Sequence, residues 1–79
     1  MVRLKLLSRS YCHLCDDMLA ALERHPARPR FEVAVVDVDA DSALEERYGI
    51  LVPVLLHEEV EICHYHLDAT RLEAYLAGF

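Results

Sequence analysis

The spacing of hydrophobic residues along the chain changes several times, and each spacing predicts one element of structure. Residues 2–7 first alternate apolar with basic and then run apolar, which is typical of a strand. Apolar residues recur at helical spacing from about position 12 to Arg24, and His25-Pro26 is expected to end that helix. Residues 31–38 contain a run of valines and predict a strand buried on both faces. Strand, helix and strand in this order indicate a parallel β–α–β unit with a right-handed crossover.

The second half of the chain predicts a short helix and then a hairpin. Asp41 or Ser42 can cap the helix, which is expected to stop at Gly49 with a left-handed residue. Residues 52–56 predict a third strand, with its proline near the start because proline cannot donate to a ladder. A short polar turn separates it from a fourth strand at 60–65, which hairpin geometry makes antiparallel to the third.

A last helix is expected after Asp68, whose side chain can cap it, with apolar residues at helical spacing up to Phe79. The predicted order is therefore βαβαββα. No repeat or linker interrupts it, so we expect one domain over residues 1–79. A chain of 79 residues is near the lower size at which one core can hold a fold alone.

Composition and charge narrow the class of protein. The net charge of −6 argues against a nucleic-acid binder, which needs a basic face. No apolar run approaches the roughly 20 residues that span a bilayer, and the start of the chain lacks a signal-peptide core. Three cysteines do not suit a fully paired secreted scaffold. We therefore expect a cytoplasmic protein with neither nucleic acid nor membrane as a partner.

Cys12 and Cys15 stand at the expected start of the first helix. The unpaired N–H groups and the dipole at a helix N-terminus favour a negative charge, and the thiolate is the reactive form of cysteine. Thiol–disulfide exchange also needs a second thiol within reach, and a spacing of two residues provides one. Asp16 and Asp17 compete for the same helix end, so we expect only moderate activation. The pair indicates dithiol/disulfide chemistry.

Two alternatives belong to other classes of function. Two thiolates, a third thiolate and an imidazole form an acceptable zinc set, and the chain offers one in Cys12, Cys15, Cys63 and His66. The other alternative is a binding module that keeps the fold without the chemistry. Cys63 itself is interpreted as a small buried strand residue, with an auxiliary thiol as the second interpretation.

Three sequence segments together carry a family resemblance: Tyr11-Cys12-His13-Leu14-Cys15-Asp16, Tyr48-Gly49 and Val52-Pro53-Val54-Leu55. With the order of elements, they resemble the thioredoxin superfamily, and within it the short bacterial glutaredoxin-like proteins. The resemblance covers nearly the whole chain. It implies an α/β thioredoxin-like fold of three layers, with a four-stranded mixed sheet in the order 2-1-3-4 and helices on both faces.

The resemblance also implies a function and a set of site residues. Cys12 is similar to the nucleophile of a thiol–disulfide oxidoreductase and Cys15 to its resolving thiol. Pro53 resembles the cis-proline of the superfamily, which lies beside the disulfide and exposes the backbone of the residue before it. The expected substrate-binding residues are Tyr11, His13, Val52 and Pro53, and no metal is expected.

Departures from typical glutaredoxins affect the expected partners. The segment Cys63-His64-Tyr65-His66 replaces a Gly-Gly pair, His13-Leu14 replaces Pro-Tyr between the cysteines, and Leu51 replaces a threonine. We expect no cofactor, and glutathione is the one small thiol that the resemblance leaves open. The expected substrate is a disulfide-containing protein or a low-molecular-weight thiol, served by a dithiol reductase. The chain is expected to be a monomer.

Overall fold

Four strands and three α-helices follow one another in the predicted order in the computed structural model, which describes residues 1–79. Two short 3₁₀ turns, η1 and η2, flank the second strand. The bounds in chain order are β1 Val2–Ser8, α1 His13–Glu23, η1 Arg28–Arg30, β2 Phe31–Asp37, η2 Val38–Ala40, α2 Ser42–Tyr48, β3 Val54–His57, β4 Val60–His64 and α3 Ala69–Leu76.

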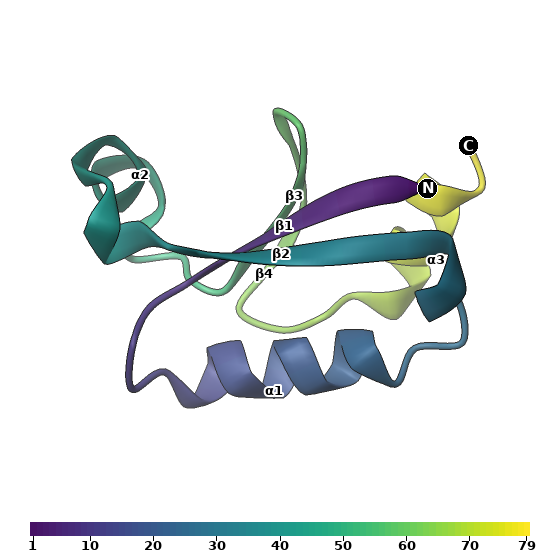
Figure 1. The fold of residues 1–79 in the computed structure, drawn as a ribbon, viewed down its shortest axis with the longest axis horizontal. Helices are drawn as coiled ribbons and strands as arrows, with labels where there is room; N and C mark the ends of the chain where they lie inside the picture. Colours follow the sequence, from purple (N-terminus) through teal and green to yellow (C-terminus); the bar gives the residue numbers. More distant parts are fainter.

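The four strands form one mixed sheet in the order β2-β1-β3-β4. β1 and β2 are parallel and pair from Val2↔Phe31 to Ser8↔Asp37. β3 is antiparallel to β1, and β4 is antiparallel to β3. β1 and β4 therefore finish at the same end of the sheet, where α1 begins. The two chain termini lie at the opposite end (Figure 1). The predicted 2-1-3-4 order is confirmed.

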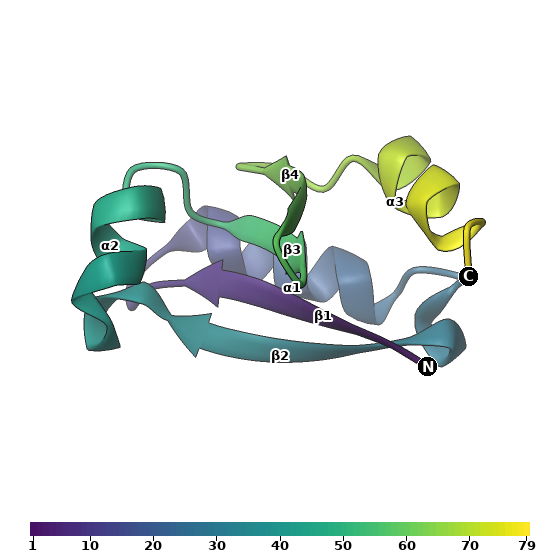
Figure 2. The same ribbon diagram turned by 90° about the horizontal axis from the view of Figure 1, so that it is seen from above.

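Helices cover both faces of the sheet, because alternate strand residues point to opposite sides. On one face Leu4 and Leu6 pack with residues of α1 and α3, including Met18 and Leu72. On the other face Leu7 and its neighbours pack with residues of η2 and α2, as Figure 2 allows the reader to follow. The result is the predicted three-layer arrangement. None of the helices combines the length and the apolar character that crossing a bilayer requires.

The prediction that β2 is buried on both faces is wrong. Phe31 is buried, but Val33 and Val36 are only half-buried and Val35 is 55% exposed. β2 is an edge strand with β1 as its one neighbour, so fewer side chains surround it than a central parallel strand would have.

Of the two residues expected to cap α2, Asp41 does so by accepting from the N–H groups of Ala43 and Leu44. The expectation for the other end of the helix needs correction. Gly49 is right-handed, with φ −54°, and a side chain there would collide with the carbonyl of Glu45. Close packing, and not a left-handed turn, therefore explains this glycine.

The third strand starts later than expected. β3 begins at Val54 rather than at Val52, and Pro53 precedes the ladder because it has no N–H to contribute. In the first turn of α1, Leu14 is 37% exposed and Cys15 takes the buried position.

Candidate active site

Cys12 is the N-cap of α1. Its backbone is extended, and its sulfur accepts a hydrogen bond from the N–H of Cys15 at 3.1 Å. The turn that leads into the cap is made by Tyr11, whose φ of 58° redirects the chain after β1. One of the unpaired N–H groups of the helix start is therefore aimed at the Cys12 sulfur, where it favours a negative charge.

Cys12 and Cys15 form a disulfide, with Cα atoms 5.2 Å apart. Their exposures differ: Cys15 is 2% exposed and faces the interior, whereas Cys12 is half-buried at the surface. The pair therefore has an outer sulfur that a large molecule can reach and an inner sulfur that it cannot.

Three loops meet at the end of the sheet where β1 finishes and the disulfide lies. Leu7 of β1 pairs with Val54 of β3. The segment that runs from β1 to Cys12 and the segment that runs from Pro53 into β3 therefore lie side by side. The Val52–Pro53 peptide bond is cis. The loop after β4 joins them, because the N–H of Tyr65 donates to the carbonyl of Pro53 at 2.9 Å.

The loop between α2 and β3 leaves a backbone segment free. Neither the N–H nor the C=O of Val52 makes a backbone hydrogen bond. The neighbouring Ile50 carbonyl accepts from the Tyr65 hydroxyl at 3.1 Å, which ties the loop to the end of β4. Val52 is thus held in place with its backbone groups available to an extended peptide.

Apolar side chains are exposed around the cysteine pair. Tyr11 is fully exposed at 105%, so it does not pack over the helix start, and Ile50 is 87% exposed. Leu14 and Tyr65 are more than a third exposed. Ile50 and Tyr65 are not among the site residues predicted from the sequence. Tyr65 could have been predicted from its place at the end of the fourth strand, whereas nothing in the local pattern marks Ile50 as a site residue.

The charged groups near the site are mostly acidic or already paired. Arg9 contacts Asp39 at 3.2 Å and Glu45 at 3.4 Å and so ties the β1–α1 loop to η2 and α2. Asp16 and Asp17 are exposed in the first turns of α1. His13, the first residue of α1, is exposed beside Cys12.

This geometry agrees with the comparison to known protein families. The family described as "Glutaredoxin-like domain (DUF836)" has a model that matches residues 3–77. The chain belongs to this glutaredoxin-like family. No curated protein matches it.

Solved structures of similar proteins extend the comparison. Protein Ne2328 from Nitrosomonas europaea is 37% identical, with a TM-score of 0.82 over 94% of this chain and 89% of that one. Protein XcR50 from X. campestris is 38% identical, with a TM-score of 0.72 over 100% and 96% of the two chains. Thioredoxin 1 from Thermosipho africanus covers 95% and 94%, with a TM-score of 0.61. At 19% identity it shares the fold with the glutaredoxin-like domain and shows no more than that.

Cys63 of the glutaredoxin-like domain lies in the core and not at the site. It is 7% exposed and packs on the α1 and α3 side of the sheet. Desolvation by burial raises the pKa of its thiol, and the N–H of Asp68 offsets this only in part. The four residues of the alternative zinc set do not form a metal-holding group, and two of them, Cys12 and Cys15, are joined in the disulfide. No group of three or more His, Cys, Asp or Glu side chains is arranged to hold a metal ion.

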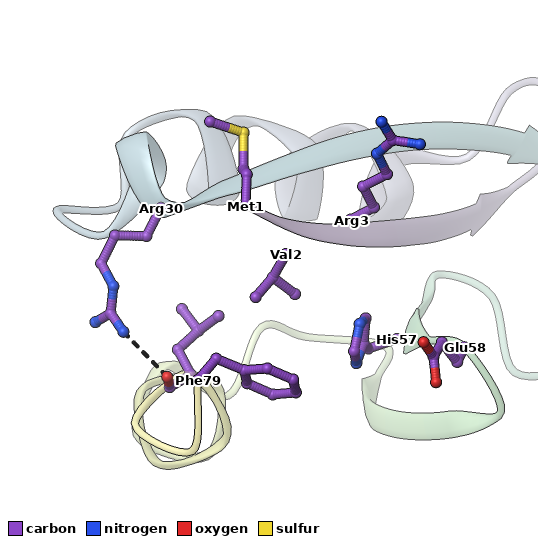
Figure 3. Close-up of a pocket in the computed structure, with 8 residues that line it drawn as sticks. Met1, Val2, Arg3, Arg30, His57, Glu58 and Phe79 are labelled. Atoms are coloured by element: carbon purple, nitrogen blue, oxygen red, sulfur yellow. Dashed lines mark hydrogen bonds between the residues drawn. The ribbon is translucent and has the colours of Figure 1, made fainter.

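The largest cavity in the domain is at the end of the sheet away from the disulfide. It has a volume of about 580 Å³ and lies between the start of β1, the β3–β4 turn and the end of α3 (Figure 3). Arg30 donates to the Leu76 carbonyl at 3.0 Å and so satisfies the end of α3. His57 is half-buried and lies edge-on to Phe79. The lining residues thus have structural roles and are separate from the cysteine pair.

Proposed function

We propose that this glutaredoxin-like domain is a thiol–disulfide oxidoreductase with Cys12 as nucleophile and Cys15 as resolving thiol. The observation that carries the proposal is the contrast within the pair. Cys12 caps a helix, accepts a backbone N–H and is accessible, whereas Cys15 is buried one turn away. Helix N-termini and access are the conditions that make a cysteine reactive.

The reaction proceeds in two exchange steps. The Cys12 thiolate attacks one sulfur of a substrate disulfide, which forms a mixed disulfide and releases the other substrate sulfur as a thiolate that takes up a proton. The Cys15 thiolate then attacks the Cys12 sulfur, forms the Cys12–Cys15 disulfide and releases the second substrate thiol. The substrate gains two electrons and two protons, and the domain is oxidised by the same amount.

The surroundings of the pair support a protein substrate. Tyr11, Ile50 and Tyr65 offer apolar contacts, and the free backbone of Val52 can pair with an extended segment. Pro53 and His13 complete the proposed docking groove beside Cys12. The nearby acidic groups and the paired Arg9 offer little to the carboxylates of glutathione, so we assign the reducing role to a dithiol protein. The proposal includes a cytoplasmic setting, where such reductants keep thiols reduced.

Trapping of covalent partners tests the proposal. In a Cys15→Ser variant the second step cannot occur, so substrates are expected to remain attached to Cys12 as mixed disulfides. The measurement is non-reducing electrophoresis after mild oxidation of cells, followed by mass spectrometry of the bands that reductant removes. Adducts at Cys12 are expected to exceed those of the wild type at least about tenfold, because resolution by a neighbouring thiol is fast.

Two matched variants serve as controls. Cys12→Ser with Cys15→Ser removes the nucleophile and is expected to abolish the adducts. Cys63→Ser with Cys15→Ser is expected to retain them, because Cys63 is buried. Adducts that survive the loss of Cys12, or an absence of adducts in every variant, would contradict the oxidoreductase and favour a binding module.

A further inference from the structure

β2 forms one edge of the sheet, and no second strand pairs with its outer side. β1 pairs with its inner side along all seven of its residues, from Phe31 to Asp37. Figure 2 shows no helix or loop alongside the outer side of the strand. A strand at an edge presents N–H and C=O groups that can pair with another strand.

The centre of this edge lacks the features that normally prevent such pairing. Residues 33–36 are Val-Ala-Val-Val, without lysine or proline, and the register with β1 contains no bulge. Val35 is 55% exposed. The opposite edge, β4, has five residues, carries Glu61 and His64, and pairs with β3 through an irregular register. β2 carries charges only towards its ends, at Glu32 and Asp37, so its uncharged centre is the more open of the two edges to strand pairing.

The two ends of β2 carry opposite charges. Arg28 and Arg30 lie just before the strand, and Asp37 and Asp39 lie at and just after its end. Arg28 and Asp39 also make ion pairs within the chain, which are worth little at the surface. Arg28 and Arg30 keep their hydrogen bonds to the carbonyls of Phe31 and Leu76, so they contribute to the contact as positive charges beside the strand and not through new hydrogen bonds. A second copy that runs antiparallel would set the basic end of each strand beside the acidic end of the other.

The side chains fit the same arrangement. With Ala34 on the two-fold axis, Val33 of each copy lies opposite Val35 of the other, on the same face of the sheet. Glu32 lies opposite Val36, so no like charges face each other across the contact. The strand is thus complementary to itself in charge, in register and in the face that each residue occupies.

We propose that the protein forms a two-fold homodimer through antiparallel pairing of its β2 edges, which joins two four-stranded sheets into one sheet of eight strands. The cysteine pair lies at the end of β1 and not along this edge, so both sites stay open. Association does not depend on redox activity, and it replaces the expectation of a monomer.

Sedimentation equilibrium from about 10 μM to about 1 mM protein tests the proposal, because a contact of this size gives a weak complex. The wild type is expected to approach twice the mass of one chain at the highest concentration. Val35→Lys is expected to remain at the mass of one chain, since an edge lysine opposes strand pairing. The matched control is Val60→Lys, an exposed valine on the other edge, which is expected to associate as the wild type does. Circular dichroism of each variant checks that it folds.

Measurements on the wild type alone provide an independent readout. Concentration-dependent shifts of backbone amide resonances are expected over residues 31–37 and not over 60–64. Added salt of about 1 M is expected to favour the monomer by screening the charge pairs at the strand ends. A wild type that stays monomeric at 1 mM, shifts confined to β4, or equal association of Val35→Lys would overturn the proposal.

Discussion

Position in the fold separates the reactive cysteine from the inert one at the scale of single residues. Cys12 lies outside the sheet, at a helix start that points an N–H at its sulfur. Cys63 lies on β4 among side chains of the core, where burial disfavours a thiolate. The same chemical group is therefore prepared for exchange in one place and kept protonated in the other.

The buried thiol makes stability depend on pH. The pKa of Cys63 is raised in the folded protein by desolvation, with the carboxylates of Asp68 and Glu61 adding to the effect. Above the ordinary cysteine pKa of about 8.5 the unfolded chain releases a proton that the folded protein retains, so stability falls as pH rises. Urea unfolding of the disulfide form at pH 7 and at about pH 9.5 is expected to show this loss, and Cys63→Ala is expected to lose less. An equal loss in both proteins would contradict the assignment.

At the scale of elements, short helices depend on their caps. α2 has seven residues, too few to persist without tertiary contacts and satisfied ends. Asp41 accepts from two N–H groups at its start, at 3.0 and 3.3 Å. This single side chain therefore contributes a large share of the local stability of the element that covers one face of the sheet.

Replacement of the cap measures that share. Asp41→Ala is expected to lower the free energy of unfolding by about 0.5–2 kcal/mol, whereas Asp41→Asn retains most of the stability because asparagine caps equally well. Glu46→Ala, which removes an exposed carboxylate of the same helix, is the comparison and is expected to change stability by less than about 0.5 kcal/mol. Urea titrations of the three variants provide the test. If the alanine and asparagine variants were equally destabilised, the hydrogen bonds would not be the cause.

The same scale shows what a sequence can predict of this fold. Spacing located all seven helices and strands, because each buries one face and so repeats with its own period. Spacing did not reveal that β2 is an edge strand, since a run of valines looks the same at an edge and in the centre of a sheet. Spacing also could not distinguish a left-handed Gly49 from a right-handed one that close packing requires, because both need the absence of a side chain.

For the whole molecule, the topology decides which residues form the site. The cysteine pair was recognisable from its spacing and Pro53 from the resemblance, but Ile50 and Tyr65 join them only because β1 and β4 end at one edge of the sheet. Contacts of this kind depend on the register between strands that are distant in sequence. Local patterns carry no information about that register until the strand order is known.

A sheet with helices on both faces also determines how the molecule unfolds. Leu55 of the central strand β3 packs with α1 and α3, and its neighbour Leu56 packs on the α2 side. Both layers therefore depend on the same backbone ladder, and neither can lose its core without exposing the other. A domain of this size has a total stability of about 5–15 kcal/mol, so one cavity removes a large part of it.

Alanine at either position is expected to destabilise the whole domain in one step. Leu55→Ala and Leu56→Ala should each lower the free energy of unfolding by about 2–5 kcal/mol, whereas Val60→Ala at the exposed edge should cost less than about 1 kcal/mol. Each variant is made in two backgrounds in which phenylalanine replaces all tyrosines except Tyr48 on one face or Tyr75 on the other. Tyrosine fluorescence in the two backgrounds and far-ultraviolet circular dichroism are expected to give coincident transitions. Separate transitions for the two tyrosines would mean that each face has a core of its own, with the sheet acting as a boundary between two units and not as the element that couples them.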